Sequence, residues 1–206
     1  MIVNSADTQN MTQGIYYHNL RVDTSDGTFT ILNGLIFVES NIGAVEYSGK
    51  KPNILNYNSF IDGTLKEASV LNAEIIPQFM FNNCNYLLNI IMPNVKRIEW
   101  MAFNNCTNLA ITSLPDGIEF IGDGAFFNCT NLAITSLPSG ITTIVSSAFY
   151  GCTNLTSLTF NGTPTRIDRN AFYGCTNLTD IYVPWSEGAV ANAPWGATNA
   201  TIHYNS

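Results

Sequence analysis

Two successive stretches of this sequence decide its fold: residues 106–128 read CTNLAITSLPDGIEFIGDGAFFN, and residues 129–151 read CTNLAITSLPSGITTIVSSAFYG. They are identical at 15 of 23 positions, which indicates two copies of one structural unit. A unit this short buries its apolar side chains only by stacking on the same side chains of neighbouring copies. The sequence therefore predicts a solenoid, in which the chain winds through a stack of short coils.

The period extends in both directions from these two copies. Successive cysteines lie 22, 23, 23 and 23 residues apart, and five phenylalanines keep the same spacing. Because stacked coils place like residues on like residues, we expect interior ladders of Phe, Leu, Ile and Cys. The predicted phenylalanine and cysteine rungs are Phe81, Phe103, Phe126, Phe149 and Phe172, and Cys84, Cys106, Cys129, Cys152 and Cys175.

The repeating pattern A-F-x-x-C-x-N-L, followed by L-x-x-(I/L)-x-(F/V/L)-P, resembles the BspA-like leucine-rich repeat family. The matching stretches are residues 102–114, 125–137, 148–160 and 171–183, and the resemblance covers residues 76–184. It implies extracellular or surface proteins of bacteria, and of some phages and protists, that bind host proteins, glycans or other cells. Residues 109–114 and 132–137 space their apolar residues differently from residues 155–160, so the strand register of these two coils stays open.

The fold class we predict is a β-rich solenoid, a right-handed leucine-rich repeat coil of about five to six repeats of 22–23 residues with a small N-terminal β cap. Residues 61–184 form the solenoid, and a degenerate first coil spans 61–83. Residues 1–60 form a β-rich cap or accessory region, with strands over 15–22 and a hairpin over 28–38 that turns at Asn33-Gly34. Residues 185–206 form a C-terminal cap with a final strand over 201–204.

Charge and hydropathy exclude two classes of partner. Eight basic and fifteen acidic residues give a net charge of −7, which argues against nucleic acid, and no apolar run is long enough for membrane insertion. Residues 1–10 contain no cationic start followed by an apolar core, so no signal peptide is recognised. Either the protein is made without a signal, or this chain is a mature or trimmed form.

The residues that usually carry chemistry do not form a site in this sequence. His18 and His203 lie at opposite ends of the chain without Cys, Asp or Glu at a metal-ligand or triad spacing. We interpret the cysteines as small buried hydrophobes, because cysteines stacked in register have poor disulfide geometry. No phosphate loop, nucleophile elbow or zinc-binding helix motif is present. We expect a protein that is not an enzyme and that has no catalytic residue, metal or cofactor.

Positions that differ between coils are candidates for binding, since the repeated positions build the scaffold. The candidate binding face consists of Arg97, Glu99, Phe120, Thr143, Arg166, Asp168 and Tyr182. If these residues share a side, Phe120 and Tyr182 would anchor a partner within a rim of mixed charge. The alternative is an ordinary solvated strand face.

Two further residue sets have competing interpretations. Trp185 and Trp195 either close the last coil as a lid or form an aromatic patch for carbohydrate. The repeated asparagines either form a structural ladder at tight bends or carry or bind glycans. This set comprises Asn85, Asn108, Asn131, Asn154 and Asn177.

The leading functional hypothesis is a non-enzymatic, surface or secreted adhesion-type module of bacterial origin that binds a protein or a glycan. One alternative is a structural spacer or phage tail component, located in the virion, that forms a homo-oligomer through its N-terminal region. A second alternative is a carbohydrate-binding protein that uses Trp185 and Trp195. The expected location is extracellular or at the cell surface.

Overall fold

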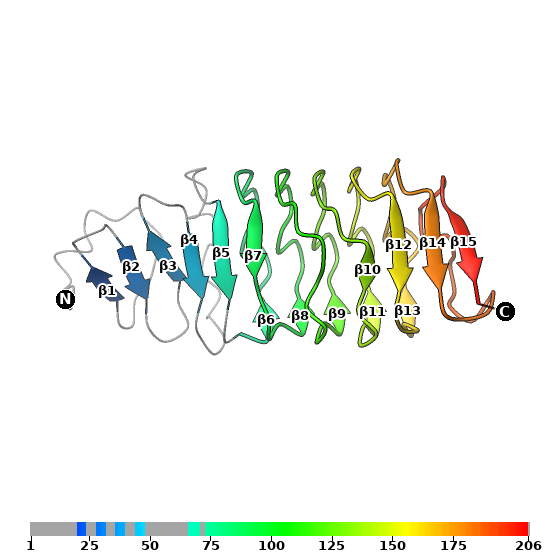
Figure 1. The fold of residues 1–206 in the computed structure, drawn as a ribbon, viewed down its shortest axis with the longest axis horizontal. Coiled ribbons are helices and arrows are strands. Elements are labelled where there is room, and N and C mark those ends of the chain that lie inside the picture. The colour runs from blue at the N-terminus through cyan, green and yellow to red at the C-terminus, as the bar shows by residue number, and fades with distance from the viewer. Residues whose placement is uncertain are drawn as a thin grey trace.

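The computed structural model describes residues 20–23, 28–31, 36–39, 44–47, 66–70 and 73–205. From residue 66 onward, successive coils stack along one axis, and the strands follow each other along it from β5 to β15 (Figure 1). Each complete coil contributes an extended segment to one side and a two-residue strand to a second side. The solenoid predicted from the sequence period is confirmed.

The side that carries the longer strands is called the long-strand side. Its strands are β5 (Glu67–Val70), β7 (Asn89–Ile91), β10 (Ser136–Leu137), β12 (Ser157–Phe160), β14 (Asp180–Val183) and β15 (Thr201–Tyr204). Neighbouring strands pair in parallel, and Leu158 pairs with Ile181, its counterpart one repeat later. Burial alternates along β12 and β14, so Leu158 and Phe160 point into the core while Thr159 faces solvent.

The other strand-bearing side is called the short-strand side. Its five parallel strands are β6 (Ile75–Ile76), β8 (Arg97–Ile98), β9 (Phe120–Ile121), β11 (Thr143–Ile144) and β13 (Arg166–Ile167). The second residue of every strand is a buried isoleucine. The first residue therefore points outward, and it differs from coil to coil.

Four strands precede β5 in the chain: β1 (Leu20–Asp23), β2 (Thr28–Ile31), β3 (Ile36–Glu39) and β4 (Ala44–Tyr47). β1 to β4 pair as antiparallel neighbours, and β4 pairs with β5 in parallel, so the N-terminal strands continue the sheet of the first coils. The hairpin predicted over 28–38 corresponds to β2 and β3. Its Asn33-Gly34 turn and residues 15–19 lie outside the described residues.

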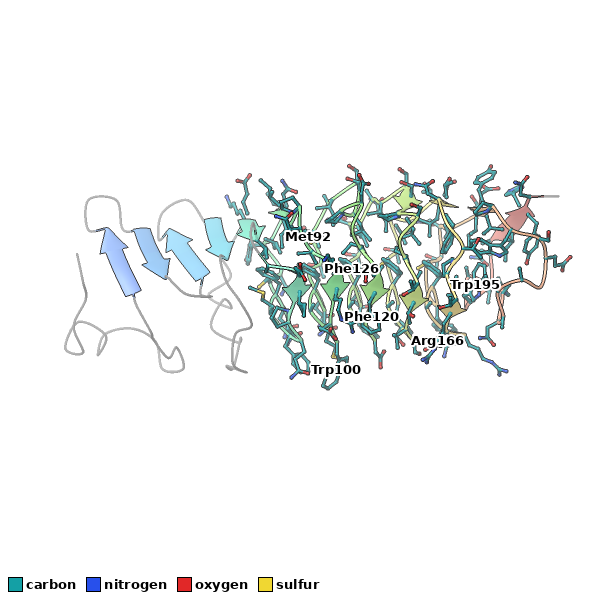
Figure 2. The ribbon with its side chains drawn as sticks, turned by 90° about the horizontal axis from the view of Figure 1, so that it is seen from below. Met92, Trp100, Phe120, Phe126, Arg166 and Trp195 are labelled. Carbon is teal, nitrogen blue, oxygen red and sulfur yellow. The ribbon has the colours of Figure 1, made fainter. Side chains whose placement is uncertain are left out.

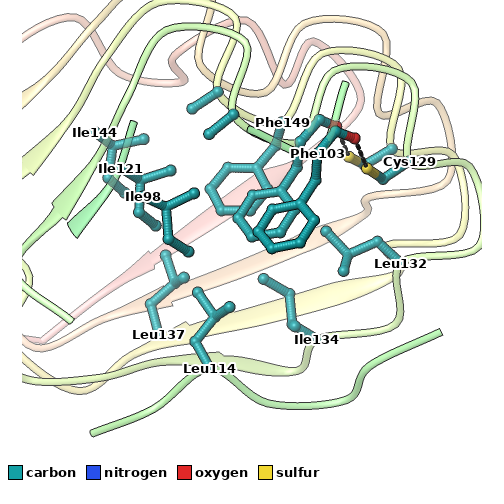
Figure 3. Close-up of a cluster of buried hydrophobic side chains, with 14 of the residues drawn as sticks. Ile98, Phe103, Leu114, Ile121, Cys129, Leu132, Ile134, Leu137, Ile144 and Phe149 are labelled. Carbon is teal, nitrogen blue, oxygen red and sulfur yellow. Dashed lines mark hydrogen bonds between the residues drawn. The ribbon is translucent and has the colours of Figure 1, made fainter. Parts of the chain in front are cut away.

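The interior is a set of ladders, as the period predicted. The phenylalanine rings stack face to face, with 5.2–5.4 Å between ring centroids and 2–6° between ring planes. Figure 3 shows Phe103 and Phe149 with the isoleucines of the short-strand side on one flank, Leu132 on the other, and Leu137 of β10 below the isoleucines. All five rings are fully buried, and burying one such side chain contributes about 1.5–3 kcal/mol. The Phe column is thus shared by both sides.

The five cysteines are buried and form no disulfide, as expected. They are more than small hydrophobes, because the thiol of each of the last four donates a hydrogen bond to a phenylalanine carbonyl of the preceding coil. Cys129 Sγ, for example, lies 3.0 Å from the carbonyl oxygen of Phe103 (Figure 3). Burial raises the pKa of the Cys129 thiol, so the protonated donor is the stable form.

The two coils whose register was open are locally irregular. Residues 109–114 form no strand, and residues 132–137 form only the two-residue β10. Ile111 and Leu114 point into the core while Thr112 and Ser113 between them are exposed. Regular alternation along a strand brings every second side chain to the core, whereas this spacing places two exposed residues in succession. The long-strand side is consequently interrupted between β7 and β10.

The repeated asparagines bond to the preceding coil, which supports their structural interpretation. Asn108 Nδ2 lies 2.6 Å from the carbonyl oxygen of Asn85, and Asn177 Nδ2 lies 2.8 Å from that of Thr153. A second amide ladder was not predicted: Asn105 Nδ2 donates to Asn83 Oδ1, and Asn128 Nδ2 donates to Asn105 Oδ1. These three residues have positive φ, and Gly151 and Gly174 take their place in the next two coils.

Candidate functional site

The short-strand side brings together most of the predicted binding residues. Arg97, Phe120, Thr143 and Arg166 occupy the outward position of β8, β9, β11 and β13, and parallel pairing sets them in one row. Figure 2 shows this side, with Phe120 and Arg166 labelled. Glu99 and Asp168 follow β8 and β13 directly. We call these six residues the short-strand face: Arg97, Glu99, Phe120, Thr143, Arg166 and Asp168.

The charged residues of the short-strand face are arranged in pairs. Arg97 Nε lies 2.9 Å from Glu99 Oε1, and the guanidinium carbon of Arg97 lies 3.9 Å from the ring centroid of Phe120. Arg166 contacts Asp168 through two hydrogen bonds of 2.7 and 2.9 Å, which raise the pKa of the arginine. Asp168 Oδ2 also accepts the backbone N–H of Ser146. Each arginine of the face thus has a carboxylate partner two residues further along the chain.

Tyr182 does not belong to this face, so the condition that it shares a side with Phe120 is not met. It lies on β14 of the long-strand side, where its ring stacks on His203 with 4.4 Å between centroids. His203 Nε2 lies 2.7 Å from Asp180 Oδ1, and this hydrogen bond lowers the pKa of Asp180. Outward rows on both sides repeat with the same period, so spacing alone does not assign a residue to a side.

Trp185 and Trp195 fit the lid interpretation and not the carbohydrate patch. Trp195 is fully buried and Trp185 is 6% exposed, and both pack against Phe160 and against each other. Trp195 Nε1 donates to the carbonyl oxygen of Ala191 at 2.8 Å. A buried indole presents no surface on which a sugar can stack. The packing therefore supports the lid over the carbohydrate alternative.

A cluster beside the short-strand face was missed in the sequence. Phe79, Trp100 and Met101 lie on the turn that follows the short strands of the first coils, and we call them the apolar corner. Trp100 is 44% exposed and packs edge-to-face on Phe79, with 4.5 Å between ring centroids. Gly122 lets the next coil approach closely, because a Cβ there would lie 2.9 Å from the backbone nitrogen of Trp100. The signal in the sequence is that Trp100 and Met101 occupy positions at which the next two coils have Asp or Ser and Gly or Ser.

An outer aromatic row was also missed. Phe127 and Tyr150 stack with 4.5 Å between centroids, and Tyr150 and Tyr173 with 5.3 Å. Asn82 and Asn104 hold the same position in the first two coils and hydrogen bond to each other. The signal was the residue after Phe in the A-F-x-x-C pattern, which changes from Asn to an aromatic residue midway along the chain.

An acidic group remains unpaired near the apolar corner. Among the described residues, Lys96 pairs with Glu74 at 3.1 Å, and the carboxylate of Asp123 forms no ion pair. Asp123 occupies the position of Trp100 one coil later, and the amide of Met101 donates to its carbonyl oxygen at 2.9 Å. Partial burial and the nearby charge of Asp168 raise the pKa of Asp123. The corner is therefore apolar with an acidic border.

The described part of the chain carries neither a cluster of metal ligands nor a membrane-spanning helix. No group of three or more His, Cys, Asp or Glu side chains there is arranged to hold a metal ion. No helix in that same part is long and apolar enough to cross a membrane. What the described side chains offer is surface recognition by aromatic and paired charged groups.

The repeat identifies the family. The sequence model of the BspA type leucine rich repeat region matches residues 74–187 with six copies, more than half of the chain. The protein belongs to the BspA-type leucine-rich repeat family. Proteins built from such repeats are generally non-enzymatic, and the chain is a repeat-based binding module.

Solved structures with the same architecture include a leucine-rich repeat protein from Bacteroides ovatus, 25% identical with a TM-score of 0.55 over 82% of this chain and 46% of that one. A leucine rich cell surface protein from Faecalibacterium prausnitzii is 24% identical, with a TM-score of 0.57 over 80% of this chain and 40% of that one. This chain thus spans less than half the length of either protein. A comparison with curated proteins found no match.

Proposed function

We propose that this protein is an extracellular or cell-surface adhesion-type module that binds a protein partner through the short-strand face. The observation that carries the proposal is the contrast between the inside and the outside of the short strands. Their inward residues are isoleucines in every coil, whereas their outward residues change from coil to coil. Stacking requires the isoleucines but places no such demand on Arg97, Phe120 or Arg166.

A protein fits this face better than a polyanion or a neutral glycan does. Arg97 and Arg166 are each paired with a carboxylate, so neither is free to bind a sulfate or a phosphate. Phe120 and Arg97 offer the aromatic and guanidinium surface that is enriched at the centres of protein interfaces. The ion pairs around them supply the polar rim.

The proposed location rests on kinship. Membership of the BspA-type family implies an extracellular or surface location, and the structural neighbour from Faecalibacterium prausnitzii is described as a cell surface protein. This chain spans less than half of that neighbour. The proposal therefore concerns binding by the repeat module alone and not the activity of a whole surface protein.

The test uses arrays of cell-surface and extracellular-matrix proteins, together with a glycan array, probed with wild-type protein and with Phe120→Thr. Threonine occupies the equivalent position one coil later, at Thr143, so the fold accepts it. We expect a protein ligand whose binding weakens at least about tenfold in the variant, the loss of a strong aromatic contact. A response confined to glycans, no protein response, or a protein response that Phe120→Thr leaves unchanged would contradict the proposal.

A further inference from the structure

The apolar corner exposes large side chains where the fold does not require them. Phe79 and Met101 have φ values of 60° and 49°, in the left-handed region that bulky residues rarely adopt. The next two coils place Gly124 and Ser147 at this position with φ values of 57° and 58°. The turn therefore forms with glycine or serine, and a phenylalanine or methionine adds backbone strain to it.

The corner is also an exposed surface rather than a lid over the core. Trp100 rests on Phe79 and keeps much of its indole in solvent. The side chain of Met101 extends toward the next coil, where its Cγ would lie 3.3 Å from a Cβ at Gly124. Figure 2 shows Trp100 pointing away from the coils, at the border of the short-strand side. Phe79 and Met101 are strained and half-buried, and the Trp100 beside them is exposed. Backbone strain next to an exposed aromatic side chain is typical of functional sites.

The charges around the corner are complementary to a cation. Of the described basic side chains on the same side, Lys96, Arg97 and Arg166 are paired with carboxylates, and Arg169, two coils beyond Asp123, hydrogen bonds to the amide of Asn192. The unpaired carboxylate next to the corner is that of Asp123, which holds the position of Trp100 one coil later. A partner that brings Lys or Arg to this border gains an ion pair without breaking an existing one.

We propose that the apolar corner is the hot spot of the binding face, and that it takes a protein segment whose large apolar side chain is flanked by Lys or Arg. This inference rests on the proposed function, because it names the partner chemistry of the same side of the molecule. The apolar side chain packs on Phe79, Trp100 and Met101, and the flanking cation lies against Asp123. Aromatic and methionine side chains at the centre, with charge at the border, match the composition of protein interfaces.

The experiment selects ligands from a phage-displayed library of random 12-residue peptides on the wild-type chain. The selected peptides are then measured against variants that carry residues from the protein's own later coils. Trp100→Ser with Met101→Gly copies Ser146 and Gly124 into the corner, and Asp123→Ser removes its acidic border. The matched control is Tyr173→Asn, which copies Asn104 and removes a similarly exposed ring elsewhere.

We expect the selected peptides to contain Leu, Phe or Trp flanked by Lys or Arg. The double variant should weaken their binding at least about 30-fold, the effect of losing a hot spot, and should unfold at the same or higher temperature because strain is relieved. Asp123→Ser should weaken binding about threefold to tenfold and reduce its salt dependence. Tyr173→Asn should leave the affinity unchanged.

Several results would overturn the inference. Peptides without basic residues, equal binding to wild type and the double variant, or a loss of binding that follows unfolding of the variant would each contradict it. Phe120→Thr separates this inference from the proposed function. Peptides that lose affinity in Phe120→Thr but not in the double variant overturn the hot spot and leave the binding face intact, and peptides unaffected by either variant overturn both.

Discussion

The two strand-bearing sides of the solenoid carry different outward rows. On the long-strand side the row reads Leu88, Ala110, Ala133, Thr156 and Thr179, and on the short-strand side it reads Ile75, Arg97, Phe120, Thr143 and Arg166. Both sides pack against one column of phenylalanines, and their inward residues are equally buried. Stacking fixes the interior of both sides alike, while the exposed residues vary along the axis on each side, and the long-strand side also exposes Ile91 of β7 and Tyr182 of β14.

The largest expected effect comes from breaking the interior that the two sides share. Phe126→Ala removes a fully buried ring stacked between Phe103 and Phe149, and the neighbouring rungs hold the cavity open. We expect a loss of about 3–5 kcal/mol in the free energy of unfolding, measured by urea titration. Phe120→Ala, an outward ring on β9, serves as the control and should cost less than about 1 kcal/mol. Equal losses for the two variants would contradict the assignment of inside and outside.

Alkaline pH should weaken the interior without affecting the exterior rows. Burial raises the pKa of the Cys129 thiol and raises that of Cys175 to about 12. Because the folded pKa is the higher one, stability is complete below the unfolded pKa of about 8.5 and falls as pH rises above it, by about 1.4 kcal/mol per pH unit for each thiol. Urea titrations of wild type and Cys129→Ala from pH 8 to 10 should show a shallower decline for the variant. Parallel declines would mean that Cys129 is not buried as a thiol.

The smallest effect concerns the interruption of the long-strand side. Residues 112–114 donate no backbone hydrogen bond to the described part of the chain, whereas β12 pairs with strands on both edges. Amides of 112–114 should therefore exchange with solvent deuterium faster than those of residues 158–160. Equal protection in the two segments would show that the irregular coil forms a regular strand in solution.

Much of the fold was predictable because stacking demands repetition. The recurrence of Phe126 and Cys129 in every coil predicts that both side chains lie in the interior, and both are buried. The site was less predictable, since a period shared by both sides does not state where Tyr182 lies. The thiol bond from Cys129 and the burial of Trp195 depend on contacts between coils that spacing does not encode.

The apolar corner escaped prediction for a different reason. Trp100 and Met101 stand at positions where later coils have polar or small residues, so they break the repeat instead of obeying it. A periodic pattern is defined by the residues that recur, so residues that differ at one coil do not contribute to it. In a solenoid, residues that depart from the period at exposed positions are the better candidates for function.

We expect the short-strand side to bind the ligand and the long-strand side to remain free of it. Hydrogen–deuterium exchange, with and without a peptide selected on the wild-type chain, maps which segments the ligand protects. Protection should appear in residues 97–101 and 119–123, with unchanged exchange in residues 156–160 and 179–183. Protection confined to the latter two segments would contradict this expectation, because the ligand would then occupy the side of β12 and β14, where Tyr182 is exposed.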